Sequence, residues 1–456
     1  MIMRFINVKI IFLLLLFLCR YDANAVSPVR FTDSDLSTIG ILIKDLKTGK
    51  ILADHNSRQL MVPASTMKFV TVAAAMRQSG TTSRYETGVS LYGDYSEADS
   101  LFSGAIVINP SGDPTLNNPK IEDNDSFIKF IINILKSKSI CHFKGEIIVE
   151  GENVPQQGQI PTWEIEDAAY GYGSGWFIFN YNDNNVRYNI NTGITDPSAS
   201  FLVFEHQRSD APFEVVHGVE SETYTLYGNI PESANRWLTV PLPWPATLFF
   251  EQMLTALDES GITFENFEPD NYKALPLFSS NVWSSCERGE IYKYLMCHSD
   301  NMMAESTLRA LCPYETRDSA LVLEKQIIKE LGVNTNGMRI FDGSGLTRKN
   351  GVSPLFLSDV LGAMAKTDYA DEYASYFPVA GMDGTMRSFN FKSLKKNRLA
   401  LKTGTVNGVR CYAGYLIDRN GTPLCSVVVM LNHITCNVSE AKAAVEKYIS
   451  GILKSY

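Results

Sequence analysis

The sequence lacks the short motifs by which most metalloproteins hold an ion. It contains neither a Cys-x-x-Cys pair nor a His-Glu-x-x-His stretch. These patterns supply the thiolate or imidazole ligands that zinc requires at the spacing it needs. We therefore predict no metal site, and nothing else in the sequence indicates a cofactor.

Basic residues are fewer than acidic ones. The chain has 41 lysines and arginines against 50 aspartates and glutamates, a net charge of −9. A net acidic protein is poorly suited to neutralise phosphates, so we exclude nucleic acid as a general partner. Internal repeats and low-complexity tracts are also absent. The 456 residues, 45% hydrophobic and 20% charged, indicate a globular protein of two or three domains.

Long apolar runs are missing after residue 18, so we expect no later segment to span a membrane. Before that point, Arg4 and Lys9 precede the apolar residues 10–18, and Ala23-Asn24-Ala25 offers a small-residue cleavage site. The apolar run is short for a membrane anchor, which is the alternative reading. We predict that residues 1–25 are a secretory signal peptide and that the protein is exported.

Cysteines are few and odd in number once the signal is removed. Export permits disulfides, but the sequence does not give their connectivity, and at least one thiol stays unpaired. The cysteines beyond residue 25 are Cys141, Cys286, Cys297, Cys312, Cys411, Cys425 and Cys436.

The order of predicted elements indicates an α/β (α+β) domain interrupted by a β-rich insert. Residues 39–55 read as a hairpin and the segment after residue 65 as a helix. We assign residues 26–87 and 280–456 to the first domain and 88–279 to the insert. Predicted strands in the insert are 104–109, 145–150, 176–181, 201–205, 213–216 and 223–227. Predicted helices are 247–260, 290–311, 319–331, 354–366 and 439–453, with closing strands at 399–402, 412–417 and 426–431.

The central candidate motif is Ser65-Thr66-Met67-Lys68, which opens the apolar helix. A serine three residues before a lysine places a hydroxyl and an amine on one helix face. A lysine whose pKa is lowered by burial can take the hydroxyl proton. We predict Ser65 as the nucleophile and Lys68 as its base. The same spacing recurs at Ser126/Lys129, Ser393/Lys396 and Ser439/Lys442, in surroundings typical of a helix surface.

Two further segments carry candidate site residues. Ser299 and Asn301 belong to Ser299-Asp300-Asn301, where Ser299 can relay a proton and Asn301 can hold the lysine or a substrate amide; capping of the next helix is the alternative reading. The second segment follows a predicted strand. Lys402 brings positive charge, Thr403 and Thr405 can bind a carboxylate, and Gly404 lets a substrate backbone approach.

Together, Ser-x-x-Lys, Ser-Asp-Asn and Lys-Thr-Gly form the signature of penicillin-binding proteins and class A β-lactamases. The chain resembles class C low-molecular-mass penicillin-binding proteins, the D-alanyl-D-alanine carboxypeptidase/endopeptidase type of serine peptidase (family S13). Residues 111–116, 341–350 and 378–386 are similar to further segments of that family. The resemblance implies a penicillin-binding/β-lactamase-like transpeptidase domain, with an antiparallel sheet flanked by helices.

The resemblance also implies the chemistry. Ser65 would attack the bond between two D-alanines, and the backbone N–H groups of Ser65 and Thr405 would form the oxyanion hole. Ser299 would give a proton to the leaving D-alanine, while Lys402 with Thr403 and Thr405 would bind its carboxylate. The expected partners are peptidoglycan stem peptides, with β-lactams as inhibitors, and the expected location is the periplasm.

Two alternatives stay open beside this reading. A β-lactamase would need a deacylating glutamate, for which Glu330 and Asn334 have a suggestive spacing. Gly332 favours a helix C-cap there and a surface position for Glu330. A catalytically silent wall-binding protein is the second alternative. The sequence does not decide between trimming of terminal D-alanine and cleavage of cross-links.

Overall fold

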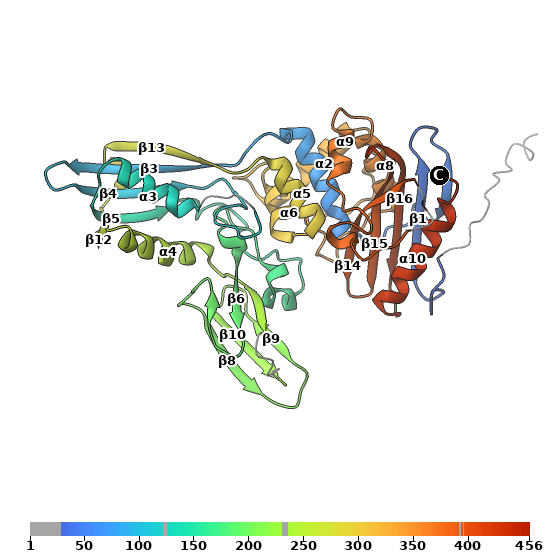
Figure 1. Ribbon diagram of the computed structural model, residues 1–456, viewed down its shortest axis with the longest axis horizontal. Coiled ribbons are helices and arrows are strands. Elements are labelled where there is room, and N and C mark those ends of the chain that lie inside the picture. The colour runs from blue at the N-terminus through green and yellow to red at the C-terminus, as the bar shows by residue number, and fades with distance from the viewer. Residues whose placement is uncertain (1–28, 122–125, 230–235, 392–393, 395) are drawn as a thin grey trace, which may run out of the picture.

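The computed structural model describes residues 29–121, 126–229, 236–391, 394 and 396–456. The predicted signal peptide, residues 1–25, lies outside them. Figure 1 shows an α/β body at one end and two β-containing arms extending from it. Among the described residues, no helix has the length and apolar character needed to cross a membrane.

The body is built on a five-stranded antiparallel sheet. Its strand order is β14 (Arg398–Val406), β15 (Val409–Ile417), β16 (Pro423–Asn432), β1 (Thr38–Asp45) and β2 (Ile51–His55). The predicted hairpin at residues 39–55 is the β1–β2 pair. The structure confirms the predicted fold class of an antiparallel sheet flanked by helices.

Both faces of this sheet are covered, because its central strands are apolar on both sides. In β16, Val428 and Met430 point into the core shared with α2 (Met67–Ser79) and α8 (Pro354–Met364). The alternate residues Val427 and Val429 pack against α10 (Val438–Ile452) on the opposite face. This alternation follows from the two-residue period of a strand.

Helix α2 runs through the middle of the body. Its residues from Met67 to Met76 are all buried. All of them except Lys68 and Thr71 are apolar, as expected of a helix enclosed on every side. It follows a short 3-10 turn, η1 (Ala64–Thr66). The helices α5 (Arg288–His298), α6 (Asn301–Arg309) and α7 (Arg317–Glu330) pack beside it.

The first arm is a second five-stranded sheet. Its order is β12 (Thr263–Asn266), β5 (His142–Val149), β4 (Leu101–Asn109), β3 (Glu86–Ser96) and β13 (Leu277–Ser284). The chain leaves the body along β3 and returns along the antiparallel β13. We propose that the chain between these two strands is the inserted unit predicted over residues 88–279.

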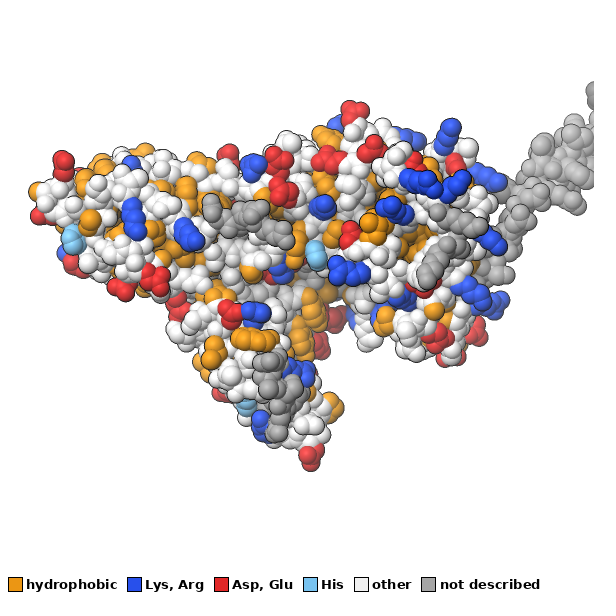
Figure 2. Space-filling view, viewed as in Figure 1, with side chains coloured by type: hydrophobic (Ala, Val, Ile, Leu, Met, Phe, Trp, Pro, Cys, Tyr) orange, Lys and Arg blue, Asp and Glu red, His pale blue; other side chains and the backbone are white. Residues whose placement is uncertain are grey.

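Two helices, α3 (Phe127–Ser137) and α4 (Pro245–Glu259), pack in the apolar core of this arm. The smaller second arm holds two three-stranded sheets. Figure 2 shows a hollow between this arm and the body. The strands of the second arm are β6 (Asn185–Asn189), β7 (Thr195–Asp196), β8 (Val203–Arg208), β9 (Glu214–His217), β10 (Thr223–Gly228) and β11 (Trp237–Pro241).

Two predicted elements need correction, and one helix was missed. The helix predicted over 290–311 is two helices, α5 and α6, because the chain turns at Ser299 with φ of 65°. The strand predicted over 176–181 is irregular, and the side chains of Asn180 and Asn184 accept backbone N–H bonds there in place of a neighbouring strand. Helix α3 was not predicted at all.

Candidate active site

The site is organised around the entry to helix α2. Ser65 lies in the η1 turn, partly exposed, and Lys68 lies in the first turn of the helix with its side chain fully buried. Lys68 Nζ is 3.1 Å from Ser65 Oγ. Ala64, just before the serine, has φ of 48°, a strained value for a residue with a Cβ. The turn therefore presents the hydroxyl directly over the amine.

Lys68 is held by two further acceptors from distant segments. Its Nζ donates to Asn301 Oδ1 at 2.6 Å and to the Ser344 carbonyl oxygen at 2.7 Å. Burial lowers the pKa of Lys68 to about 8, although the nearby carboxylates of Asp342, Asp300 and Glu305 act to raise it. Burial penalises the charged ammonium more than these carboxylates stabilise it. A base of this pKa can accept a proton near neutral pH.

The carbonyl of Ser344 had no predicted role, although its segment was noted in the sequence. Asp342 fixes this turn by accepting five hydrogen bonds. Gly345 is also required here, because its φ is +79° and a Cβ would lie 1.9 Å from the Ala64 carbonyl oxygen. The turn thus packs directly against the residue before the nucleophile. The donors to Asp342 are Ser344 Oγ, Gly345 N, Thr347 N, Asn350 Nδ2 and Trp163 Nε1.

Two buried glutamates lie behind this turn. Glu305 Oε1 accepts the N–H groups of Gly343 and Ser344 at 3.0 and 2.8 Å, and burial raises its pKa to about 7. Glu324 accepts the Thr71 hydroxyl at 2.7 Å, and burial raises its pKa to about 8. Together these contacts hold the backbone from which Ser344 faces Lys68.

Replacing Asp342 with alanine is expected to destabilise the fold by about 3–5 kcal/mol, because buried donors lose their acceptor together. The measurement is the free energy of unfolding in urea. Asp54→Ala, at an exposed position on β2, is the control and should change it by less than about 0.5 kcal/mol. A cost below about 1 kcal/mol for the Asp342 variant would contradict the role given to this carboxylate.

Ser299 and Lys402 form the second polar contact of the site. Lys402 Nζ donates to Ser299 Oγ at 2.9 Å and to the Thr403 carbonyl oxygen at 2.9 Å. Burial lowers the pKa of Lys402 well below its ordinary value, and the charge of Lys68 lowers it further. Ser299 is therefore held between two helices, α5 and α6, and its hydroxyl accepts a hydrogen bond from Lys402.

The strand β14 brings the remaining predicted residues to the same place. Thr403 Oγ1 donates to Thr385 Oγ1 at 2.8 Å, and Thr405 is exposed. A Cβ at Gly404 would lie 2.7 Å from the Pro63 carbonyl oxygen and 3.1 Å from the Ser65 nitrogen. Only glycine lets this strand approach the nucleophile turn so closely. The structure thus brings all three predicted segments together.

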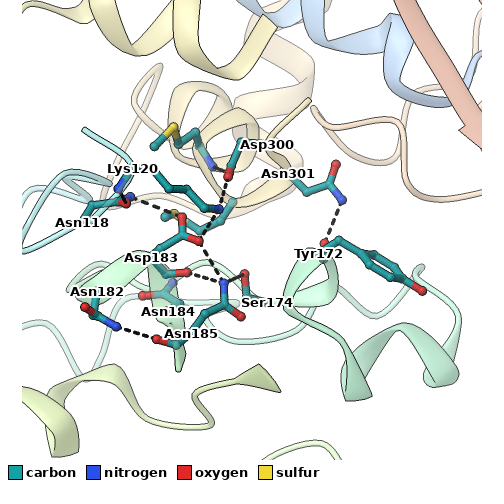
Figure 3. A network of polar contacts seen from close by, with 12 residues as sticks. Asn118, Lys120, Tyr172, Ser174, Asn182, Asp183, Asn184, Asn185, Asp300 and Asn301 are labelled. Carbon is teal, nitrogen blue, oxygen red and sulfur yellow. Dashed lines mark hydrogen bonds and ion pairs between the residues drawn. The ribbon is translucent and has the colours of Figure 1, made fainter. Parts of the chain in front are cut away.

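The arms also reach the site. Asn301 Nδ2 donates to the Tyr172 carbonyl oxygen at 2.7 Å (Figure 3). Trp163 Nε1 donates to Asp342 at 2.9 Å. Sequence reasoning missed both, because they lie more than a hundred residues away from the motifs they contact. A backbone carbonyl, as at Tyr172, also leaves no signal in residue type.

The other candidate residues lie on the surface. Ser126 precedes α3 without a capping bond, and Lys129 is exposed. Glu330 is exposed at the last turn of α7 and accepts a hydrogen bond from Gln326, with Gly332 at φ of +85° just beyond. Within the described residues, all seven cysteines are free and no cluster of histidine, cysteine or acidic side chains could hold a metal ion.

Known proteins resemble this chain in sequence and in structure. The D-alanyl-D-alanine carboxypeptidase DacB of Haemophilus influenzae is 25% identical over 414 residues, covering 84% of this chain and 83% of that protein. The crystal structure of penicillin-binding protein 4 from the same organism has a TM-score of 0.75 at 20% identity, covering 92% of this chain and 96% of that one. It has also been solved with a β-lactam, with a TM-score of 0.69.

A predatory endopeptidase from Bdellovibrio bacteriovorus, in complex with an immunity protein, has a TM-score of 0.54 at 14% identity and covers 92% of this chain and 94% of that one. At these identities the solved structures establish the fold. The family is established by the sequence itself, since residues 28–452 match one family along nearly the whole chain. The chain belongs to the D-Ala-D-Ala carboxypeptidase 3 (S13) family.

Proposed function

We propose that the protein is an exported serine peptidase that cleaves the D-Ala-D-Ala ends of peptidoglycan stem peptides through an acyl-enzyme on Ser65. The observation that carries this proposal is the 3.1 Å contact of Lys68 Nζ with Ser65 Oγ, made by a buried amine of pKa about 8. Membership of a carboxypeptidase family supports the substrate class. A protein that acts on peptidoglycan would lie in the periplasm.

In the first step, Lys68 takes the Ser65 proton as the oxygen attacks the carbonyl carbon between the two D-alanines. The carbonyl π electrons move to oxygen, where the backbone N–H groups of Ser65 and Thr405 would stabilise the negative charge. One such donor typically contributes about 3 kcal/mol to the barrier. The close approach of β14 to the nucleophile turn at Gly404 supports this pairing.

Collapse of the intermediate breaks the C–N bond, and the leaving D-alanine nitrogen needs a proton. Ser299, whose hydroxyl is hydrogen-bonded to Lys402 at 2.9 Å, would relay to it the proton that Lys68 took from Ser65, which leaves Lys68 neutral again. The terminal carboxylate would bind Lys402 with Thr403 and Thr405. Water then attacks the ester carbon while Lys68 accepts its proton; the bond between that carbon and Ser65 Oγ breaks, Lys68 returns the proton to Oγ, and the shortened peptide leaves.

Strand β14 suits an extended substrate. It is the edge strand of the main sheet and pairs with β15 on one side. On its other side Pro378 and Ala380 bond to Leu401 and Leu399, so a peptide added beyond Leu401 would gain main-chain hydrogen bonds. A β-lactam would acylate Ser65 in the same way and hydrolyse slowly. The relative solved with a β-lactam supports this second expectation.

Acylation by a penicillin is expected to rise with pH and reach half its maximum at about pH 8. Lys68 must be neutral to accept the proton, and its pKa is about 8. The rate is therefore lost as the pH falls through that value, whereas an ordinary lysine would give a midpoint near 10.4. The second-order rate constant with a fluorescent penicillin, measured from pH 6 to 10, tests this. A rate that is flat between pH 6 and 9 would contradict Lys68 as the base.

Product analysis on a cross-linked muropeptide dimer ending in D-Ala-D-Ala tests the reaction itself. We expect free D-alanine, and we propose that separated monomers also form, since a relative of similar fold is an endopeptidase. Absence of both products from protein that a penicillin acylates would overturn the substrate assignment. Absence of acylation as well would favour a silent wall-binding protein, and rapid turnover of nitrocefin would favour a β-lactamase.

A further inference from the structure

A lysine from the first arm reaches the loop that carries Ser299 and Asn301. Lys120 Nζ lies 2.7 Å from Asp300 Oδ2 and also forms an ion pair with Asp183 (Figure 3). The side chain of Lys120 is 37% exposed, but those of Asp183 and Asp300 are only 4% and 7% exposed. One ammonium group therefore pairs with two carboxylates that have almost no access to water.

Asp300 occupies the one position between the two predicted site residues of this loop. Its Oδ1 accepts the Met303 N–H at 2.9 Å and so caps helix α6, while its Oδ2 faces Lys120. The preceding Ser299 has φ of 65°, which a residue with a Cβ adopts only when its surroundings hold it there. The carboxylate of Asp300 therefore fixes the loop from the helix on one side and from the arm on the other.

The opposite end of the bridge is also rigid. Asp183 accepts hydrogen bonds from Asn118 Nδ2 at 3.3 Å and Asn185 Nδ2 at 3.1 Å. Asn118 Oδ1 in turn accepts the backbone N–H of Lys120 at 3.0 Å. The ammonium thus lies between two fixed carboxylates and is itself anchored at its backbone. Its place in the arm is defined as closely as that of Asp300 in the body.

We propose that Lys120 is a positioning residue that holds the Ser299–Asn301 loop in its reactive geometry. Without its charge, Asp183 and Asp300 would face each other in a buried site, where they repel each other or one takes up a proton, and in both cases the loop loses its ionic tether to the arm. Asn301 would then leave Lys68, and Ser299 would leave Lys402. A displacement of 1 Å in such groups can lower a rate about 10²-fold. The inference rests on the proposed function, because it assigns Lys120 a part in that reaction.

The test compares Lys120→Met, which keeps the length of the side chain, with Lys120→Arg, which keeps the charge. We expect the second-order rate constant for penicillin acylation to fall about 10- to 100-fold in the methionine variant and less than about 3-fold in the arginine variant. Lys144→Met is the matched control, since Lys144 forms an ion pair of 2.6 Å with Glu265 elsewhere in the same arm. It should leave the rate unchanged.

A double variant separates positioning from folding. In Lys120→Met with Asp183→Asn, the amide can donate to Asp300 and restore a neutral tether, so we expect the rate to recover at least 5-fold over the single variant. Melting temperatures are measured for all variants. A methionine variant within 2-fold of the unchanged protein would overturn the proposal, and so would a rate loss that merely follows the loss of folded protein.

The pH profile supplies a readout that a structural role would not move. Removing Lys120 leaves the charge of Asp300 unbalanced, which raises the pKa of Lys68. The acidic limb of acylation should therefore shift to higher pH in Lys120→Met and stay in place in Lys120→Arg. A lower rate with an unshifted limb would assign Lys120 to folding alone. The charged groups around Lys68 are Asp300 in the loop, Glu305 on α6, Asp342 in the 342–345 turn and Lys402 on β14.

The proposed function and this inference fail in different ways. If the unchanged protein is not acylated by a penicillin, the proposed function is wrong and no variant needs to be compared. If the unchanged protein is acylated and Lys120→Met is acylated equally well, the function stands and the role of Lys120 is wrong.

Discussion

Ser65→Ala is expected to abolish acylation and to lower peptidase turnover by about 10⁵-fold or more. Alanine removes the atom that forms the covalent bond with the substrate. Loss of a nucleophile typically removes nearly all of the rate enhancement that the catalytic residues provide together. The fold should survive, because Ser65 is only partly buried and Lys68 keeps Asn301 and Ser344 as hydrogen-bond partners. The measurements are labelling by a fluorescent penicillin and release of D-alanine.

Ser126→Ala is the matched control for this variant. Ser126 begins the other Ser-x-x-Lys pair that precedes a helix, and its side chain makes no capping bond to α3. We expect labelling and turnover of the Ser126 variant to equal those of the unchanged protein. Persistent labelling of Ser65→Ala would show that another residue is acylated.

Lys68→Met is expected to lower both acylation and deacylation by about 10⁴-fold. Methionine matches much of the lysine's volume but cannot accept the proton of Ser65 or of the attacking water, and general base catalysis contributes up to about 10⁴ in rate. The amide oxygen of Asn301 and the carbonyl of Ser344 also lose their shared donor. An unsatisfied buried acceptor costs about 1–3 kcal/mol, so stability should fall as well.

Stopped-flow acylation and urea unfolding of Lys68→Met measure these two effects separately. Lys129→Met removes the exposed lysine of the second Ser-x-x-Lys pair and should change neither quantity. A Lys68 variant that keeps more than a tenth of the normal acylation rate would mean that a different group activates Ser65.

The predicted site residues could be found from sequence because their chemistry lies in their side chains. Ser65 with Lys68 and Lys402 with Gly404 form short local patterns, and the apolar character of α2 indicated its burial. Their convergence then follows from the sheet, since the close fit of Gly404 to Pro63 and Ser65 joins β14 to the nucleophile turn. Local pattern and tertiary packing agree at this point, which favours a unique fold.

The break between α5 and α6 could not be predicted from periodicity. Apolar residues continue at helical spacing across residues 290–311, and the interruption depends on a single left-handed residue, Ser299, followed by the cap from Asp300. Both a helix interior and a cap are compatible with serine and aspartate. The sequence showed the cap as an alternative, and the structure has it.

Residues that act through their backbone or from another part of the chain were missed for a physical reason. Ser344 serves Lys68 through a carbonyl, which every residue type carries. Tyr172 also contributes a carbonyl to Asn301. Lys120 contributes a side chain, but its partner Asp300 is 180 positions away, so no local pattern links them.

The wrong strand at residues 176–181 has a similar origin. Its aromatic and β-branched residues favour a strand, but Asn180 and Asn184 supply side-chain acceptors for the backbone N–H groups of Phe177 and Tyr181. Local side-chain bonds of this kind compete with pairing to a neighbouring strand. Composition alone does not show which of the two prevails.

The most direct test of the account is to identify the acylated residue. The protein is incubated with a penicillin, quenched in acid and digested, and the peptides are examined by mass spectrometry. One adduct is expected, on the peptide that contains Ser65, and it should be lost in Ser65→Ala. An adduct on any other residue, or none at all on folded protein, would contradict this expectation.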